Sequence, residues 1–450
     1  MGEISVKTGN NARNGGKNSL NRLIRCVCGK KIGPDPRNFN QRVSLGRNDL
    51  LIRTFPSDWH VKRFGYIFSE NKTKNRGLIE NNVLSLSYGN IKEKNVEDNK
   101  GLLPESFETY QLIEPNDIIF RFTDLQNDKR SLRSAISNYK GIITSAYISV
   151  RTRQNAEYFN YLFRAYDLQK VYYSMGDGMR QSLKIDELNR MPITVPNQQI
   201  QTQIANYLDQ ETQKIDTLIA KQEKLIELLE EQRKSVISHA VTKGLDPNAP
   251  MKDSGVEWLG DVPSHWDIIS IKHLANCSSG QGINSLEISD MSNDENCFPV
   301  IGGNGEMGWT SKSNYKVPVL SIGRVGALCG NVHLINYQSW ISDNSLILKV
   351  HSKKIGLKIL KYILLARDLN ILASKSAQPL ITGTQVKNEK IVLPPLKEQD
   401  LIVEFIKTEN LRINNLTEKQ KALIEKLKEY RASIISHAVT GKIDVRELVA

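Results

Sequence analysis

The sequence predicts an α+β chain in which two mixed α/β globular modules are separated by two long helices. The helices are expected to form an antiparallel coiled coil, with a pseudo-twofold internal repeat. Three observations lead to this prediction. A segment near residue 220 recurs 198 residues later, apolar residues recur every seven positions in both copies, and proline and glycine bracket each copy.

The internal repeat defines the order of the segments. Residues 221–242 align with residues 419–440 without a gap, with 15 identities in 22 positions. Upstream, PSDW at 56–59 is echoed by PSHW at 263–266. The predicted segments are a basic extension (1–50), a first module (51–196), a central helix (197–243), a second module (244–394), a C-terminal helix (395–443) and a tail (444–450).

The helices carry a heptad pattern that is typical of a coiled-coil seam. The predicted a positions are Leu208, Ile215, Gln222, Leu229 and Val236, matched by Ile406, Ile413, Gln420, Leu427 and Ile434. The predicted d positions include Leu218 and Leu225, matched by Leu416 and Leu423. Because a polar residue at a central a position fixes register, Gln222 and Gln420 are expected to pair.

An alternative interpretation is that each helix packs separately on its own module, because Ile219 and Ile226 widen the apolar stripe. The boundary signals are the same for both helices. Pro196 and Pro394-Pro395 precede them, and Gly244 and Gly441 follow them.

Composition narrows the class of protein. The net charge is +12 and no apolar run reaches the ~18 residues of a membrane span. The start of the chain lacks the apolar centre of a signal peptide, and five cysteines fit a reducing compartment, so a cytoplasmic protein is expected. Residues 1–50 hold 10 Lys and Arg against 3 Asp and Glu, so most of the excess charge lies there.

Motifs of catalysis and cofactor binding are scarce in the sequence. The pattern GxGxxG at residues 303–308 opens no helix, so we interpret it as a tight surface turn and not as a dinucleotide site. Cys26 and Cys28 have no second ligand pair at zinc spacing. We predict no catalytic residue and no metal site in this chain.

Loops rich in basic, amide and hydroxyl side chains recur in both modules and suggest a nucleic-acid partner. Arg and Lys neutralise phosphates, and Arg, Asn and Gln can read base edges. The candidate DNA-binding residues are Lys72, Lys74, Arg76, Ser87, Tyr88, Arg180, Gln181, Asn304, Arg324, Thr382 and Gln385.

Several strings make the chain similar to a known family. They are EWLGDVPSHW at 257–266, LPPLKEQ at 393–399, SHAVT at 238–242 and 436–440, GIITSAY at 141–147, SIGRVG at 321–326 and WISDNSL at 340–346. Together they resemble the specificity subunit of Type I restriction–modification enzymes, over about residues 50–447. Residues 49–55 and VPNQQ at 195–199 depart from the family pattern.

The resemblance implies two target-recognition domains, each reading one half of a bipartite site in double-stranded DNA, with the helices as the spacer. It also implies two DNA adenine methyltransferase subunits and restriction/translocase subunits as partners. S-adenosylmethionine, ATP and Mg²⁺ would belong to those partners, and this chain would hold no cofactor.

Two other functions stay open from the residues alone. One is a coiled-coil scaffold whose globular ends bind proteins and have no DNA specificity. The other is a nuclease or methyltransferase active on its own, which the scarcity of catalytic motifs disfavours.

Overall fold

The computed structural model of the chain describes residues 56–95, 106–123, 132–175, 182–316, 318–326, 328–374 and 379–447. It divides into two compact units. Unit 1 joins Met1–Ala220 to Ile424–Ala450, and unit 2 is Lys221–Leu423. Both divisions cross a long helix, so the six predicted segments stay a prediction. The basic extension lies outside the described residues.

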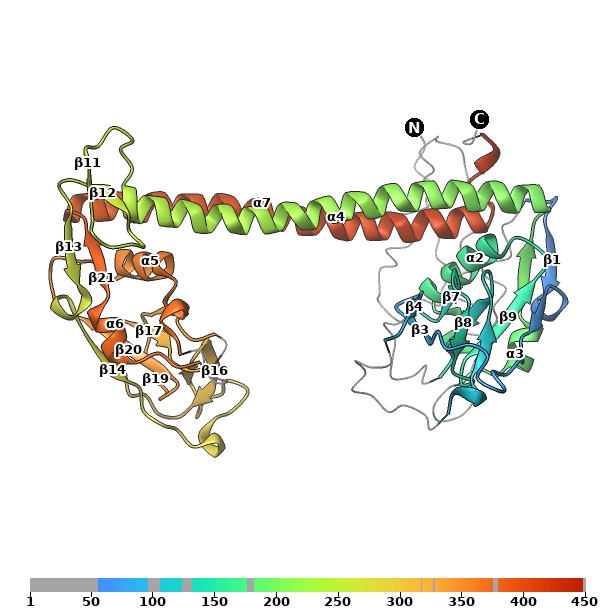
Figure 1. The fold of residues 1–450 in the computed structure, drawn as a ribbon, viewed down its shortest axis with the longest axis horizontal. Helices are drawn as coiled ribbons and strands as arrows, with labels where there is room; N and C mark the ends of the chain where they lie inside the picture. Colours follow the sequence, from blue (N-terminus) through green and yellow to red (C-terminus); the bar gives the residue numbers. More distant parts are fainter. Residues whose placement is uncertain are drawn as a thin grey trace, which may run out of the picture. The chain divides into compact units, whose positions relative to one another are not determined.

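Unit 1 contains a module of short strands and two helices (Figure 1). Its strands are β1 (His60–Arg63), β2 (Phe68–Glu70), β3 (Leu84–Ser87), β4 (Asn90–Glu93), β5 (Gln111–Ile113), β6 (Ile118–Phe120), β7 (Ser134–Ile136), β8 (Gly141–Ile143), β9 (Ile148–Thr152) and β10 (Pro192–Val195). Its module helices are α2 (Ala156–Leu168) and α3 (Ile185–Arg190). The central sheet has the order β2-β9-β6-β7, and β1 pairs with β10, β3 with β4 and β5 with β8.

Unit 2 contains the second module. Its strands are β11 (Met251–Asp253), β12 (Asp261–Pro263), β13 (Asp267–Ser270), β14 (Ala275–Ser279), β15 (Phe298–Gly302), β16 (Gly305–Thr310), β17 (Val319–Gly323), β18 (Val332–Ile335), β19 (Trp340–Ile341), β20 (Ser345–Val350) and β21 (Lys390–Leu393). Its module helices are α5 (Leu357–Arg367) and α6 (Gly383–Asn388).

The central sheets of the two modules have the same strand order, although the sequences of the modules are not similar. The central sheet of unit 2 runs β14-β20-β17-β18, which repeats the order β2-β9-β6-β7 of unit 1, and all neighbours are antiparallel in both. In each unit the strand that leads into the central sheet also pairs with the last strand of the module, β1 with β10 and β13 with β21. The side sheets differ, because β5 and β8 are antiparallel whereas β15 and β19 are parallel.

The cores of the two modules use different side chains for the same sheet. In unit 1, Phe64, Phe68 and Phe163 pack as an aromatic cluster, with Phe64 and Phe68 stacked at 4.4 Å between ring centroids. The fully buried cluster of unit 2 is aliphatic apart from Trp266 and Cys329. The same strand order is therefore supported by aromatic side chains in one module and by aliphatic side chains in the other, as cores that keep their hydrophobic pattern tolerate.

The long helices begin and end where the proline and glycine signals predicted. Helix α4 spans Gln198–Lys243 and α7 spans Leu396–Val439. The Asn197 side chain caps α4 by accepting a hydrogen bond from the Ile200 amide at 2.9 Å. Gly244 and Gly441 adopt positive φ values of 77° and 68° just past the two helices, as helix-ending glycines do. None of the described helices has the length and hydropathy of a membrane span.

Most of the apolar residues predicted at a positions are buried. Leu208, Ile215 and Leu229 of α4 are buried, as are Ile406 and Ile413 of α7.

Three of the four leucines predicted at d positions face solvent, and the fourth, Leu416, is half-buried. Leu218 and Leu225 are 44% and 39% exposed, and Leu423 of α7 is 41% exposed. The second buried or half-buried line runs one residue later and comprises Thr212, Ile219, Ile226, Arg233 and Ala240 in α4, and Asn410, Thr417, Ile424, Arg431 and Ala438 in α7. From each a position, the predicted d position is three residues further on and this buried line is four residues further on. Both lines repeat every seven residues, so the heptad period alone could not show which of them is covered.

Contacts between the helices pair an early stretch of one with a late stretch of the other. In unit 1, Arg431 of α7 donates from Nε and Nη2 to the Asp216 carboxylate of α4 at 2.9 and 3.2 Å. In unit 2, Arg233 of α4 donates from Nη2 to Asn414 Oδ1 of α7 at 2.6 Å.

The echoed PSDW and PSHW strings form the same turn. The Trp59 amide donates to the Pro56 carbonyl at 3.0 Å, and the Trp266 amide donates to the Pro263 carbonyl at 2.9 Å. Each indole then packs against a helix-ending glycine, since a Cβ on Gly441 would lie 3.3 Å from Trp59 Cζ2 and one on Gly244 would lie 3.2 Å from Trp266 Cζ2.

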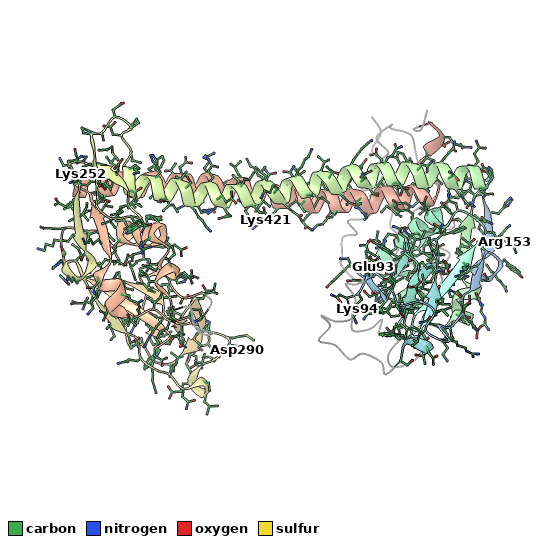
Figure 2. All side chains as sticks on the ribbon, viewed as in Figure 1. Glu93, Lys94, Arg153, Lys252, Asp290 and Lys421 are labelled. Carbon is green, nitrogen blue, oxygen red and sulfur yellow. The ribbon has the colours of Figure 1, made fainter. Side chains whose placement is uncertain are left out.

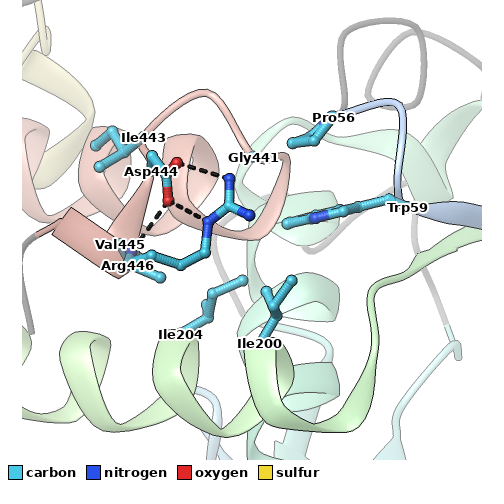
Figure 3. Close-up of a pocket in the computed structure, with 9 residues that line it drawn as sticks. All are labelled: Pro56, Trp59, Ile200, Ile204, Gly441, Ile443, Asp444, Val445 and Arg446. Carbon is cyan, nitrogen blue, oxygen red and sulfur yellow. Dashed lines mark hydrogen bonds and ion pairs between the residues drawn. The ribbon is translucent and has the colours of Figure 1, made fainter.

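A shallow pocket in unit 1 marks this contact (Figure 3). Its apolar wall includes Pro56, Trp59, Ile200 and Ile204, and Gly441 and residues 443–446 complete its lining. The Asp444 carboxylate there accepts from its near neighbour Arg446 at 2.7 and 2.8 Å, which lowers its pKa. The pocket joins the end of α7 to the first module and is not the candidate functional site.

Replacing Gly441 by Ala should destabilise unit 1. An added Cβ would stand 2.2 Å from Pro56 Cδ, at a φ of +68°. We expect a loss of about 2–4 kcal/mol, combining the left-handed backbone cost with overpacking. The measurement is hydrogen–deuterium exchange over residues 56–70 and 434–446 of the full chain.

Gly77→Ala is the matched control. Its φ is +75°, but a Cβ there would meet nothing within 4 Å, so this variant isolates the backbone term. Equal loss of protection in the two variants would contradict the steric contact between Gly441 and Pro56.

Candidate nucleic-acid interface

The basic loop of unit 1 is held by two buried asparagines. Asn71 donates from Nδ2 to the Leu112 carbonyl at 2.6 Å and to Asp117 Oδ2 at 3.3 Å. Asn75 donates to the Glu80 carbonyl at 2.9 Å and accepts from the Glu80 amide at 3.0 Å. Neither asparagine is among the candidate residues predicted from the sequence. The two asparagines fix the backbone on either side of Lys72 and Lys74 and just before Arg76.

The three basic candidates of this loop differ in what they contact. Lys72 pairs with Glu70 at 2.8 Å, and this hydrogen bond raises the pKa of the lysine. Lys74 donates from Nζ to the Thr109 carbonyl at 3.2 Å and to Ser145 Oγ at 2.5 Å. Arg76 is exposed. Lys74 therefore braces the loop, and Arg76 is the more available cation.

Ser87 and Tyr88 lie at the tip of the β3–β4 hairpin. Tyr88 and Gly89 both have positive φ, 47° and 75°, as the two central residues of a type I′ turn do. Arg164 of α2 donates to the Gly89 carbonyl at 2.5 Å and supports the turn from below. Tyr88 is left 74% exposed, with its ring available for stacking.

Arg180 and Gln181 lie outside the described residues.

The GxGxxG string of unit 2 forms the β15–β16 hairpin turn, which confirms the sequence interpretation. Asn304 is at the tip of the turn, exposed, and accepts from Asn331 Nδ2 at 2.7 Å. Gly323 packs its backbone against this turn, because a Cβ on Gly323 would stand 2.1 Å from the Gly303 carbonyl oxygen. Asn304 and Arg324 are thereby brought to one corner of the module.

Arg324 follows the last residue of β17 and is half-buried. Its Nη1 donates to Ser279 Oγ at 2.7 Å, at the end of β14. Ser279 and Asn331 are site residues that the sequence did not indicate, because neither lies in a loop of basic composition.

Thr382 and Gln385 serve a structural role in this unit. They form the capping box of α6, in which the Gln385 amide donates to Thr382 Oγ1 at 3.3 Å and the Gln385 side chain accepts from the Thr382 amide at 2.9 Å. Gln385 Nε2 also donates to the Leu372 carbonyl at 2.8 Å. Both side chains are exposed, so a DNA contact for them stays a prediction.

Gln222 and Gln420 are both half-buried in the described helices. Their role in register stays a prediction.

Charge on the module surfaces is mixed in sign. Figure 2 shows Glu93 and Lys94 side by side at the end of the β3–β4 hairpin, and Lys421 and Asp290 elsewhere on the surface. The candidate interface therefore rests on particular loop side chains, and not on a broad basic face.

Comparisons with known proteins show what the chain is similar to. Residues 263–426, which include the corner of Asn304 and Arg324, match the family model of the Type I restriction modification DNA specificity domain. The specificity subunit of the Type I restriction enzyme MjaVIII from Methanocaldococcus jannaschii is 24% identical over 424 residues, covering 87% of this chain and 95% of that subunit. The EcoprrI specificity subunit from Escherichia coli is 30% identical over 140 residues, covering 31% of this chain and 35% of its own length.

A solved structure from work on complex assembly and conformational transition of the type I R-M system shares the fold. Its TM-score is 0.64 at 16% identity, and the match covers 86% of this chain and 99% of that chain. The resemblance indicated by the motifs is thus confirmed: the chain is similar, along most of its length, to specificity subunits of Type I restriction–modification systems.

Proposed function

We propose that this chain is the DNA sequence-specificity subunit of a Type I restriction–modification complex. The observation that carries the proposal is the match to a named specificity subunit along 87% of the chain. The exposed Arg, Asn and Tyr side chains at the loops of both modules are of the types that contact phosphates, base edges and base faces.

The recognised site would be bipartite, with one half read by each module. Two modules with one strand order and different loop residues suit this role, because the shared sheet supports the loops while the loops differ in chemistry. Residues 51–196 and 244–394 would be the two target-recognition domains.

The long helices would set the distance between the half-sites, as an antiparallel coiled coil with pseudo-twofold symmetry. The cross-helix contacts support this. Arg431–Asp216 in unit 1 and Arg233–Asn414 in unit 2 are related position by position through the offset of 198 residues. A helix of 46 residues is roughly 70 Å long at 1.5 Å per residue, close to two turns of B-DNA.

The helices would also dock two DNA adenine methyltransferase subunits, with restriction/translocase subunits joining them. Exposed apolar side chains on the helices support a docking role; in unit 2 they include Leu225, Leu228, Leu401 and Phe405. Catalysis, S-adenosylmethionine, ATP and Mg²⁺ would belong to those partners in the cytoplasm, and this chain would contribute recognition alone.

The main rival is a scaffold whose modules bind proteins. The similarity to specificity subunits favours the DNA-binding role over the scaffold. A scaffold would show no sequence-selective DNA affinity, whereas binding through phosphate contacts should weaken steeply with salt.

Exchanging residues 51–196 for the corresponding module of a related specificity subunit should change one half of the recognised site. The other half should stay the same, because residues 244–394 are untouched. The measurement is the sequence context of methylated adenines in DNA from cells that carry the exchanged gene. An unchanged site in a folded exchange variant would rule out the proposed function.

Inserting seven residues after Gln222 and seven after Gln420 should lengthen the spacer by about three base pairs. Seven residues add roughly 10 Å and keep the buried line in phase. The half-sites should be unchanged, as read by the same methylation mapping.

The matched control inserts seven residues after Gln222 alone. That change leaves α7 too short to cover the longer α4 segment, so we expect lower thermal stability without a longer functional spacer. A spacer lengthened equally by the single and the double insertion would argue against two helices acting together as the ruler.

A further inference from the structure

The backbone of Arg324 is fixed on both sides at the point where several strands of unit 2 end. Its amide donates to the Asn344 carbonyl at 2.9 Å, just before β20, and its carbonyl accepts from the Ile381 amide at 2.9 Å. The preceding Gly323 packs against Gly303 of the β15–β16 turn with no room for a Cβ. Arg324 therefore projects from a constrained corner and not from a loose loop.

The guanidinium of Arg324 is oriented but only partly satisfied. Nη1 donates to Ser279 Oγ at 2.7 Å, while Nε is buried and makes no hydrogen bond in the described part of the chain. A buried donor without an acceptor carries a free-energy cost, so this group has hydrogen-bonding capacity that a water molecule or a ligand can meet.

Arginines elsewhere in the chain show how different this arrangement is. Arg367 of unit 2 donates from Nε to Glu389 Oε2 at 2.6 Å, and Arg151 of unit 1 donates from Nε and Nη2 to the Asp117 carboxylate at 2.7 and 3.0 Å. Their side chains are neutralised by a carboxylate. Arg324 is held by a neutral hydroxyl, which fixes its direction and leaves its positive charge intact.

The neighbouring groups are also neutral and polar. Asn331 donates to Asn304 Oδ1 at 2.7 Å, and Asn304 is exposed at the tip of the adjoining turn. An oriented guanidinium beside an exposed amide matches the two side-chain types that read purine edges in the major groove.

We propose that Arg324 is the residue of the second module that reads a guanine, through the paired acceptors O6 and N7, and that Ser279 is its positioning residue. This inference rests on the proposed function. A phosphate contact requires charge and reach but little direction, whereas reading one base edge requires a guanidinium fixed in direction. The constrained backbone and the Ser279 hydrogen bond supply that direction.

The test replaces the gene in the source cell by variants and maps methylated adenines genome-wide. The variants are Arg324→Gln, Arg324→Lys and Ser279→Ala, with Arg412→Lys on α7 as the matched control and a gene deletion as the reference. Thermal unfolding of each purified full chain reports whether the variant is folded.

The expected result is local. Arg324→Gln should relax one G·C position of one half-site by about 10- to 100-fold in relative methylation, the discrimination typical of one bidentate base contact. Ser279→Ala should relax the same position by a smaller factor, and Arg412→Lys should leave every position unchanged.

Two outcomes would overturn the inference. One is a uniform fall in methylation at all sites with the same recognised sequence, which identifies a phosphate contact. The other is a folded Arg324→Gln protein that methylates nothing while Arg324→Lys restores the full wild-type sequence preference, which makes charge alone sufficient. If deletion of the gene leaves the methylation pattern intact, the proposed function itself fails, and this outcome is distinct from both.

Discussion

A buried glutamine near the start of each long helix ties that helix to its module. Gln201 of α4 accepts from the amide of Asn155, the cap of α2, at 3.2 Å and donates to the Pro196 carbonyl at 2.8 Å. Gln399 of α7 repeats this arrangement, accepting from the Gly356 amide that caps α5 at 2.9 Å and donating to the Pro394 carbonyl at 2.8 Å. Both side chains are almost fully buried. The direction in which each helix leaves its module therefore depends on hydrogen bonds with fixed partners, which permit little displacement of the helix. The loops that carry the candidate DNA contacts inherit their position from this junction.

The long helices and their ends could be predicted because their signals are local. Proline before a helix and glycine after it act within a few residues, and the structure places the helix ends beside them. The inner face of the helices could be predicted only in part. Leucines at Leu218 and Leu225 fit the heptad as well as Ile219 and Ile226 do, and only the opposing surface decides which pair is covered. The shared strand order of the two modules could not be predicted, because one core is aromatic and the other aliphatic.

The candidate site could be predicted at the level of loops, and less well at the level of side chains. Composition identified the turn of Asn304 and the strand end of Arg324, but it could not indicate that Ser279 would reach Arg324 from another strand. The structural role of Thr382 and Gln385 could have been predicted. A threonine followed three residues later by a glutamine is the sequence pattern of a capping box at the start of a helix. Lys74 is likewise a basic residue, but its ammonium group donates hydrogen bonds within the module, to the Thr109 carbonyl and to Ser145.

The pairing of β1 with β10, and of β13 with β21, gives each module the topology of an insert. The chain enters and leaves a module through neighbouring antiparallel strands, so the two attachment points lie side by side whatever the interior contains. An exchange of genetic material within that boundary would alter the interior without straining the junction with the helices. New recognition sequences could then arise in combinations, one module at a time, by recombination between related genes instead of by the slow accumulation of point changes.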